Sequence, residues 1–204
     1  ERVDATTVDL LKKCGCTLIG IEHHLLVPHI SPLLTGGSTC VENREEVNMR
    51  EMIYDVISDV KQLPSGKNIE IKANLPEGPL SYSGVYGDIR RALLNLVENG
   101  VKYVSSARDQ GGRVDITVGD STEALRISVD DNGPGVPEEE RELIFERFRR
   151  GDHHRARRGS SFGGYGLGLS ISRRIAEREG GSLEIEGSGL GGASFIMTLP
   201  RKQS

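Results

Sequence analysis

Hydrophobic and polar positions follow different periods along the chain, and the change between them predicts two regions. In residues 1–45, apolar side chains recur at alternating steps of three and four from Leu11 to Leu25, which is typical of a helix packed against another helix. Two prolines follow and are expected to kink or end that helix. We therefore predict a short helical segment at residues 1–45 and a second, larger domain at residues 46–204.

The larger region mixes helical and strand periods. Helical periodicity and helix start and stop signals predict helices at residues 47–60, 87–103, 137–148 and 167–179. Alternating apolar and polar positions predict strands at residues 69–75, 113–118, 124–129, 182–186 and 193–199. Strands that adjoin in sequence, with helices between the groups, predict an α/β fold built as a two-layer sandwich.

Composition excludes several classes of protein. The chain has 204 residues and a formal net charge of -4, which gives no overall attraction to nucleic acid or to anionic lipid. No apolar run approaches the roughly 20 residues of a bilayer span, so we expect membrane attachment only through parts absent from this sequence, which begins at Glu1. Cys14, Cys16 and Cys40 match no usual zinc pattern and fit a reducing cytoplasm.

The first of three clusters with candidate chemistry lies on the expected helix at residues 87–103. Asn95 and Asn99 are four residues apart, as are Glu98 and Lys102, so polar groups line one side of the helix. Amide oxygens can hold Mg²⁺ beside phosphates, and a lysine can meet a phosphate. The alternative interpretation is an ordinary solvated helix face.

The second cluster is Asp131-Asn132-Gly133-Pro134-Gly135, directly after an expected strand. A carboxylate at a strand end can accept a hydrogen bond from an exocyclic amine such as that of adenine, and glycines beside it let the backbone approach a flat ring. Because Asn-Gly and Pro-Gly are strong turn formers, a plain turn is the alternative.

The third cluster, residues 163–170, is rich in glycine and opens the expected helix at residues 167–179. The free N–H groups and the dipole at such a helix start form an anion site. Just before it, residues 147–158 carry six arginines and one aspartate, a local charge of +5 in an acidic protein. This basic stretch suits a lid over a polyphosphate. The alternative is a nucleic-acid patch, which the net charge opposes.

Taken together and in this order, the clusters resemble the catalytic, ATP-binding domain of two-component sensor histidine kinases, within the GHKL (HATPase) group of ATPases and kinases. Residues 95–103 are similar to that family's asparagine box, residues 131–135 to its first glycine box, residues 144–148 to its phenylalanine box and residues 164–170 to its second glycine box. The resemblance covers about residues 47–200. It implies a GHKL (Bergerat) α/β sandwich that binds ATP and Mg²⁺.

The resemblance also implies which residues contact each part of the nucleotide. The resemblance implies that Asn99 is the Mg²⁺ ligand. The residues expected around the metal, the phosphates and the edge of the nucleotide are Asn95, Asn99, Lys102, Tyr103, Gly164, Gly166, Leu167, Gly168 and Leu169. At the adenine ring we expect Gly133, Gly135 and Asp131, of which Asp131 would bind the adenine amine. At the hinge of a mobile lid we expect Phe145 and Phe148.

One position separates kinase from hydrolase within the group. The resemblance implies that gyrase-, MutL- and Hsp90-like hydrolases carry a water-activating glutamate four residues before the metal asparagine, and this chain has Asn95 there. Without a general base for water, the γ-phosphate should await another acceptor.

The expected acceptor and catalytic histidine is His23. Residues 23–28 resemble the family's H box in this histidine and in Pro28, whereas His24 replaces the usual acid and Leu26 the usual basic residue. About two dozen residues separate His23 from the catalytic domain, too few for a second dimerisation helix of about 30 residues. An abbreviated dimerisation region and a histidine without an acceptor role both remain open.

The resemblance implies a cytoplasmic kinase module that autophosphorylates on histidine and passes the phosphoryl group to the receiver domain of a response regulator. We expect a homodimer formed through the N-terminal helical segment, and no nucleic-acid partner. Two alternatives remain: an ATP-binding regulatory module without kinase activity, and a protein-serine kinase of the anti-sigma-factor type, which uses a partner's hydroxyl as acceptor.

Overall fold

The structure is a computed structural model that describes residues 44–66, 68–108, 110–148 and 166–201. Contacts divide the chain into two units, Glu1–Glu42 and Asn43–Ser204, and the described residues all belong to the second. The expected N-terminal helix and His23 therefore lie outside the described residues. Within the described ranges, no helix combines the length and the apolar character needed to cross a bilayer.

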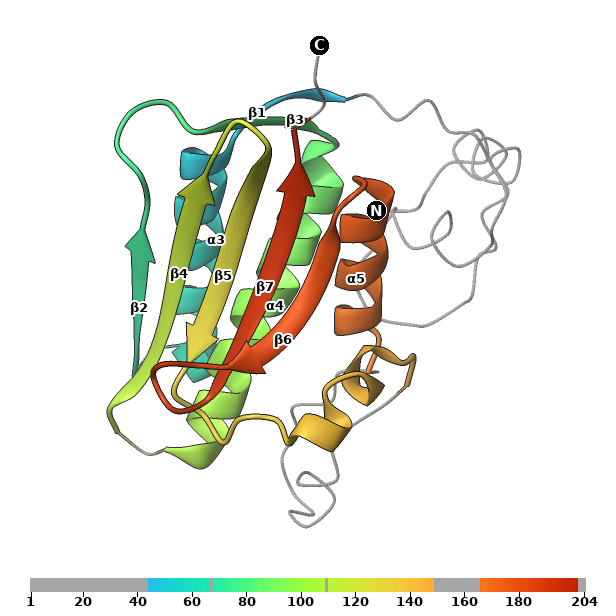
Figure 1. Ribbon diagram of the computed structural model, residues 1–204. Coiled ribbons are helices and arrows are strands. Elements are labelled where there is room, and N and C mark those ends of the chain that lie inside the picture. The colour runs from blue at the N-terminus through green and yellow to red at the C-terminus, as the bar shows by residue number, and fades with distance from the viewer. Residues whose placement is uncertain (1–43, 67, 109, 149–165, 202–204) are drawn as a thin grey trace, which may run out of the picture. The chain divides into compact units, whose positions relative to one another are not determined.

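A five-stranded mixed sheet forms one layer of the second unit (Figure 1). Its strand order is β2-β4-β5-β7-β6, in which β2 and β4 run parallel and the other neighbours antiparallel. The strands are β2 (Ile69–Asn74), β4 (Gly112–Asp120), β5 (Ala124–Asp131), β6 (Ser182–Gly187) and β7 (Ala193–Pro200). All five occur where the alternating pattern predicts them, because their inward positions carry apolar side chains that the fold buries.

Three α-helices among the described residues form the second layer and lie on one side of the sheet (Figure 1). They are α3 (Met49–Gln62), α4 (Tyr86–Ala107) and α5 (Gly168–Arg178). The core between the layers is aliphatic, with Leu96 of α4 and Ile127 of β5 both fully buried. The predicted two-layer α/β sandwich is therefore confirmed.

The first helix of this unit begins later than predicted, and a small second sheet accompanies it. That sheet consists of β1 (Glu45–Asn48) and β3 (Ser81–Gly84), which pair antiparallel. α3 begins only at Met49, because the Asn48 side chain caps it by accepting a hydrogen bond from the Glu51 N–H at 3.3 Å. The sequence pattern missed both strands, since four residues are too few to establish a period of two.

The prediction of a helix at residues 137–148 is wrong. The chain there forms two short 3₁₀ helices, Glu138–Glu140 and Leu143–Phe145. Within these turns only Phe145 is buried. Because a continuous α-helix in a protein depends on packing of an apolar stripe, a proline and acidic residues at the start were not enough to maintain one.

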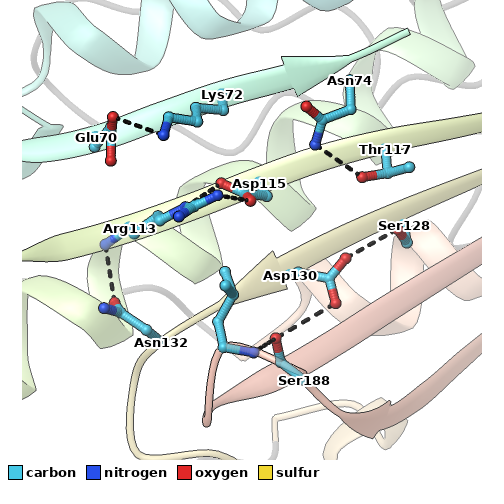
Figure 2. A network of polar contacts seen from close by, with 11 residues as sticks. Glu70, Lys72, Asn74, Arg113, Asp115, Thr117, Ser128, Asp130, Asn132 and Ser188 are labelled. Atoms are coloured by element: carbon cyan, nitrogen blue, oxygen red, sulfur yellow. Dashed lines mark hydrogen bonds and ion pairs between the residues drawn. The ribbon is translucent and has the colours of Figure 1, made fainter. Parts of the chain in front are cut away.

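The outer face of the sheet is polar and carries a network of hydrogen bonds and ion pairs (Figure 2). On β4, Arg113 Nε donates to Asp115 Oδ1 at 2.7 Å, and on β5 the Ser128 hydroxyl donates to Asp130 at 2.9 Å. Because side chains alternate along a strand, Asp131 points to the opposite side from Asp130. The sheet therefore has one polar face and one face that forms the core and the candidate site.

Candidate functional site

Asp131 is a buried carboxylate at the end of β5, with 3% of its surface exposed. Its Oδ1 accepts hydrogen bonds from the backbone N–H groups of Gly133 at 2.8 Å and Ala193 at 3.2 Å. Among the described residues, Oδ2 has no such partner. Burial raises the pKa of Asp131, the two backbone hydrogen bonds oppose this, and the nearby charge of Asp130 adds to it. Asp131 thus presents one fixed, desolvated acceptor oxygen.

Asn132 fixes the turn that follows Asp131. Its Oδ1 accepts from the Arg113 backbone N–H at 2.8 Å, and its Nδ2 donates to the Gly111 carbonyl at 2.9 Å. Its own carbonyl accepts from Arg108 Nε at 2.7 Å. These bonds tie the turn to the start of β4 and to the end of α4, so the first glycine box is held on a rigid frame.

Two glycines, Gly133 and Gly192, keep the backbone close around the Asp131 carboxylate, and a third, Gly135, has a backbone conformation that favours glycine. A Cβ at Gly133 would lie 3.0 Å from Asp131 Oδ1 and 3.5 Å from the Tyr103 carbonyl carbon, and a Cβ at Gly192 would lie 2.2 Å from Asp131 Oδ1. Gly135 has a φ of 71°, which other residues rarely adopt. Sequence reasoning missed Gly192, because it stands in the β6–β7 loop and only its neighbours in space connect it to the site.

Asn95 joins α4 to the start of α5. Its Nδ2 donates to the Gly168 carbonyl oxygen at 3.3 Å and to the Ser172 hydroxyl at 3.4 Å. A Cβ at Gly168 would lie 3.5 Å from both Cγ and Oδ1 of Asn95, so the two helices are in close contact here. The Asn95 amide therefore positions the helix start that belongs to the second glycine box.

Asn99 and Lys102 follow along α4, and both are half-buried. Lys102 Nζ lies 5.9 Å from the centre of the Tyr103 ring, and burial raises the pKa of Tyr103. Tyr103 lies against the Asp131 turn, through the close approach of Gly133, and Asn95 lies against the start of α5, through its hydrogen bond to Gly168. The structure thus brings the asparagine box against both glycine boxes.

The two phenylalanines expected at the lid hinge have different environments. Phe145 is buried, and the Arg173 guanidinium lies 4.8 Å from the centre of its ring. Phe148 is 72% exposed and has a φ of 64°, which is unusual for a residue other than glycine. Its backbone N–H donates to the Gly166 carbonyl at 3.0 Å. Phe145 is therefore held by packing, whereas Phe148 is held by its backbone.

The remaining expected residues divide between described and undescribed parts of the chain. The four from Gly166 to Leu169 are partly exposed at the start of α5. Gly164 and the arginines at positions 149–158 lie outside the described residues, as does His23. The described residues contain no group of three or more His, Cys, Asp or Glu side chains that could hold a metal.

Comparison with known proteins defines the class. A family model described as histidine kinase-, DNA gyrase B-, and HSP90-like ATPase matches residues 84–203. The match covers more than half of the 204 residues, so the chain belongs to this family of ATP-binding domains.

Individual relatives narrow the class to histidine kinase catalytic domains. The adaptive-response sensory kinase SasA of Prochlorococcus marinus (strain MIT 9313) is 32% identical over 160 residues, which is 78% of this chain and 41% of SasA. Full-length ShkA in complex with AMPPNP has a TM-score of 0.67 and 28% identity over 83% of this chain and 33% of ShkA. Histidine kinase ThkA in complex with response regulator protein TrrA has a TM-score of 0.63 and 28% identity over 78% of this chain and 42% of ThkA.

The chain spans about two fifths of the length of the curated relatives it matches. What it shares with them is the catalytic domain of the histidine kinase type, whose family model matches residues 84–203.

Proposed function

We propose that this chain is an ATP-dependent histidine kinase module of a two-component sensor. The observation that carries the proposal is the desolvated Asp131 carboxylate together with Gly133 and Gly192. Because glycine has no side chain, no side chain of these two residues covers the backbone beside the carboxylate. A free carboxylate oxygen next to bare backbone suits the exocyclic amine and the flat ring of adenine. The complex of the similar ShkA with AMPPNP supports this choice of ligand.

Metal and phosphate contacts would come from α4 and from the start of α5. The residues fit Mg²⁺, because α4 offers the amide oxygen of Asn99, and that of Asn95 beside it, as oxygen ligands of the kind Mg²⁺ prefers. Asn99 would be the ligand, and phosphate oxygens and water would complete the shell. When bound, Mg²⁺ would neutralise charge on the transferred phosphate. Lys102 and the first N–H groups of α5 would hold the phosphate oxygens.

The Asn95 amide favours transfer to a protein acceptor over hydrolysis. Its Nδ2 is a donor in both of its hydrogen bonds, and an amide has no basic group to take a proton from water. We assign His23 as the acceptor. Its unprotonated imidazole nitrogen would form a bond to the γ-phosphorus while the bond from that phosphorus to the β-γ bridging oxygen breaks. ADP leaves, and the proton on the other ring nitrogen passes to water.

We further propose transfer of the phosphoryl group to a response-regulator aspartate, which the complex of the similar ThkA with TrrA supports. A cytoplasmic location and a homodimer through residues 1–45 belong to the same proposal. Two other functions follow if His23 is not the acceptor, as the unusual His24 and Leu26 beside it suggest. They are a regulatory ATP-binding module and a protein-serine kinase.

The deciding experiment incubates the chain with γ-labelled ATP and Mg²⁺ and then treats the labelled protein with acid or base. Acid-labile, base-stable label that is lost in His23→Gln and kept in the matched control His24→Gln supports the histidine kinase. Acid-stable label on an added partner protein supports the serine kinase. No label despite measured nucleotide binding supports the regulatory module, and no nucleotide binding at all overturns all three.

A further inference from the structure

A second buried carboxylate lies at the far end of α5, away from the candidate site. Glu179 directly follows the last residue of that helix, and its side chain is 1% exposed. Its Oε2 forms an ion pair with Arg44 Nη1 at 2.9 Å, and its Oε1 is buried without a hydrogen-bond partner among the described residues. Glu179 thus depends on Arg44 for compensation of its charge.

Stability alone does not explain this arrangement. A negative charge at the C-terminal end of a helix opposes the helix dipole, and a buried ion pair rarely stabilises a protein more than apolar side chains would. The additional contact to the carboxylate is weak, because the Tyr82 hydroxyl donates to Oε2 at 3.4 Å and also to the Pro200 carbonyl at 3.3 Å. Loss of the pair would therefore remove the contact that ties the end of α5 to Arg44, directly before β1, and replacement of Arg44 alone would in addition leave a buried charge.

Arg44 occupies a special place in the chain. It is the second residue of the unit Asn43–Ser204 and stands directly before β1. Its guanidinium spans two elements, because Nη1 pairs with Glu179 while Nη2 donates to the Ser83 carbonyl of β3 at 2.5 Å. A displacement of the chain just before β1 would therefore move Arg44, and with it the ion pair, before it moves residues of the core.

The opposite end of α5 belongs to the candidate site. Gly168 begins the helix and accepts from Asn95. The helix has 11 residues, and a helix of that length is a rigid rod of about 16 Å. A movement at Glu179 would therefore reach the turn at the start of α5, which is expected to hold the phosphates.

We propose that the Arg44–Glu179 pair is a clasp through which the chain entering the domain controls nucleotide affinity. The closed clasp holds α5 in the position seen here, and the released clasp lets α5 tilt and weakens the phosphate contacts. By linkage, bound nucleotide tightens the clasp to the same extent. This inference rests on the proposed function, because it concerns regulation of the same nucleotide site.

The test measures binding of Mg·ADP to the full chain by titration calorimetry in Arg44→Gln, Glu179→Gln and the double variant. Each single variant should weaken binding by about tenfold, and the double variant should be no weaker than either, since all three lack the same pair. Glu179→Gln keeps the shape and buries no charge, so this variant tests the clasp even if Arg44→Gln does not fold.

Arg201→Gln is the matched control. Arg201 also donates to a β3 carbonyl, that of Ser81 at 3.0 Å, and pairs with Asp120 at 2.6 Å, but it makes no contact of this kind with α5. It should bind Mg·ADP within twofold of the wild type. Wild-type affinity in Glu179→Gln, or an equal loss in Arg201→Gln, overturns the clasp while the nucleotide site stands.

Hydrogen exchange in the wild type gives an independent readout. Mg·ADP should slow exchange of the amides at 177–181, and both clasp variants should speed exchange at 168–172. Absence of both effects also overturns the clasp. If the wild type binds no nucleotide, the proposed function fails together with the inference, which calorimetry on the wild type alone reveals.

Discussion

Replacement of Asp131 by Asn tests how the site recognises its base. Asparagine has nearly the same shape, and its side-chain oxygen can keep the hydrogen bonds from the Gly133 and Ala193 N–H groups. Its NH₂ group would then take the place of Oδ2, and under the proposed function it would face the exocyclic amine of adenine with a second donor. The variant Asp131→Asn should therefore lose base recognition and keep the turn.

The expected size follows from the chemistry of the exchanged group. A hydrogen bond to a charged group contributes about 1.5–3 kcal/mol, and a buried donor left without an acceptor costs about 1–3 kcal/mol. We expect a loss of about 3 kcal/mol in binding of Mg·ADP, which is about a 150-fold rise in Kd.

Stability should change in the opposite direction. Burial raises the pKa of the Asp131 carboxyl in the folded protein. The contribution of its protonation to the free energy of unfolding is therefore fully present below the ordinary pKa of about 3.9, and it is lost as the pH rises through the raised pKa. At pH 7 the wild type therefore holds a desolvated carboxylate at a cost that an uncharged amide avoids. The Tm of Asp131→Asn at pH 7 should equal or exceed that of the wild type.

The assay is titration calorimetry with Mg·ADP and with Mg·IDP, in which a carbonyl replaces the exocyclic amine. The wild type should prefer ADP, and Asp131→Asn should prefer IDP, because the new NH₂ group can donate to the carbonyl. Asp130→Asn is the matched control, since Asp130 lies on the polar face of the sheet and accepts from Ser128 and Ser188 (Figure 2). A folded Asp131→Asn variant that binds ADP within threefold of the wild type would refute this account of the site.

Three further changes test the contacts around this acceptor. Asn95→Asp replaces the donor to the first carbonyl of α5 by a carboxylate; Mg·ADP affinity should fall by about tenfold and hydrogen exchange should rise at the start of α5, and unchanged exchange would contradict the positioning role. Gly192→Ala places a Cβ 2.2 Å from Asp131 Oδ1, so calorimetry should show a Tm lower by about 10 °C and no nucleotide binding, whereas a Tm within 2 °C would mean that the loop shifts freely. Gly100→Ala places a Cβ 3.3 Å from Val114 Cγ2. Urea unfolding should show little change in the free energy of unfolding for this variant alone and a gain of about 1 kcal/mol in a Val114→Ala background. Equal effects in both backgrounds would exclude crowding between residue 100 and Val114.

The elements that the sequence predicted correctly are those whose burial has a repeating pattern. β5 alternates between buried and partly exposed positions along eight residues, and α4 buries one side through 22 residues, so both are visible as periods. The segment at 137–148 carries helix-start residues but no buried stripe, and β1 and β3 are too short for a period. In this chain, a local sequence signal therefore predicts a helix or strand correctly only where a periodic pattern of buried residues accompanies it.

The candidate site divides in the same way. Asp131 and Gly133 are neighbours in sequence, so a short motif predicts their joint role. Gly192 enters the site through the pairing of β5 with β7, which no local pattern encodes. The anchoring role of Asn95 depends likewise on the packing of α5 against α4. Motifs thus name the groups that would touch the nucleotide, whereas the contacts that hold those groups in place are set by tertiary structure.

These contacts also suggest where regulation can act on the site. The Asp131 turn is fixed by ladder hydrogen bonds and by Asn132, all of which belong to the sheet or to the end of α4. The start of α5 is held to α4 by the Asn95 amide and by the Ser172 hydroxyl, which donates to the Ala92 carbonyl at 3.4 Å. Its far end is held by the Arg44–Glu179 clasp and by an ion pair between Arg178 and Asp88. Side-chain contacts of this kind break at a lower cost than a paired strand does, because only a few groups must move. We therefore expect the adenine end of the site to stay constant and the phosphate end to respond to the incoming chain.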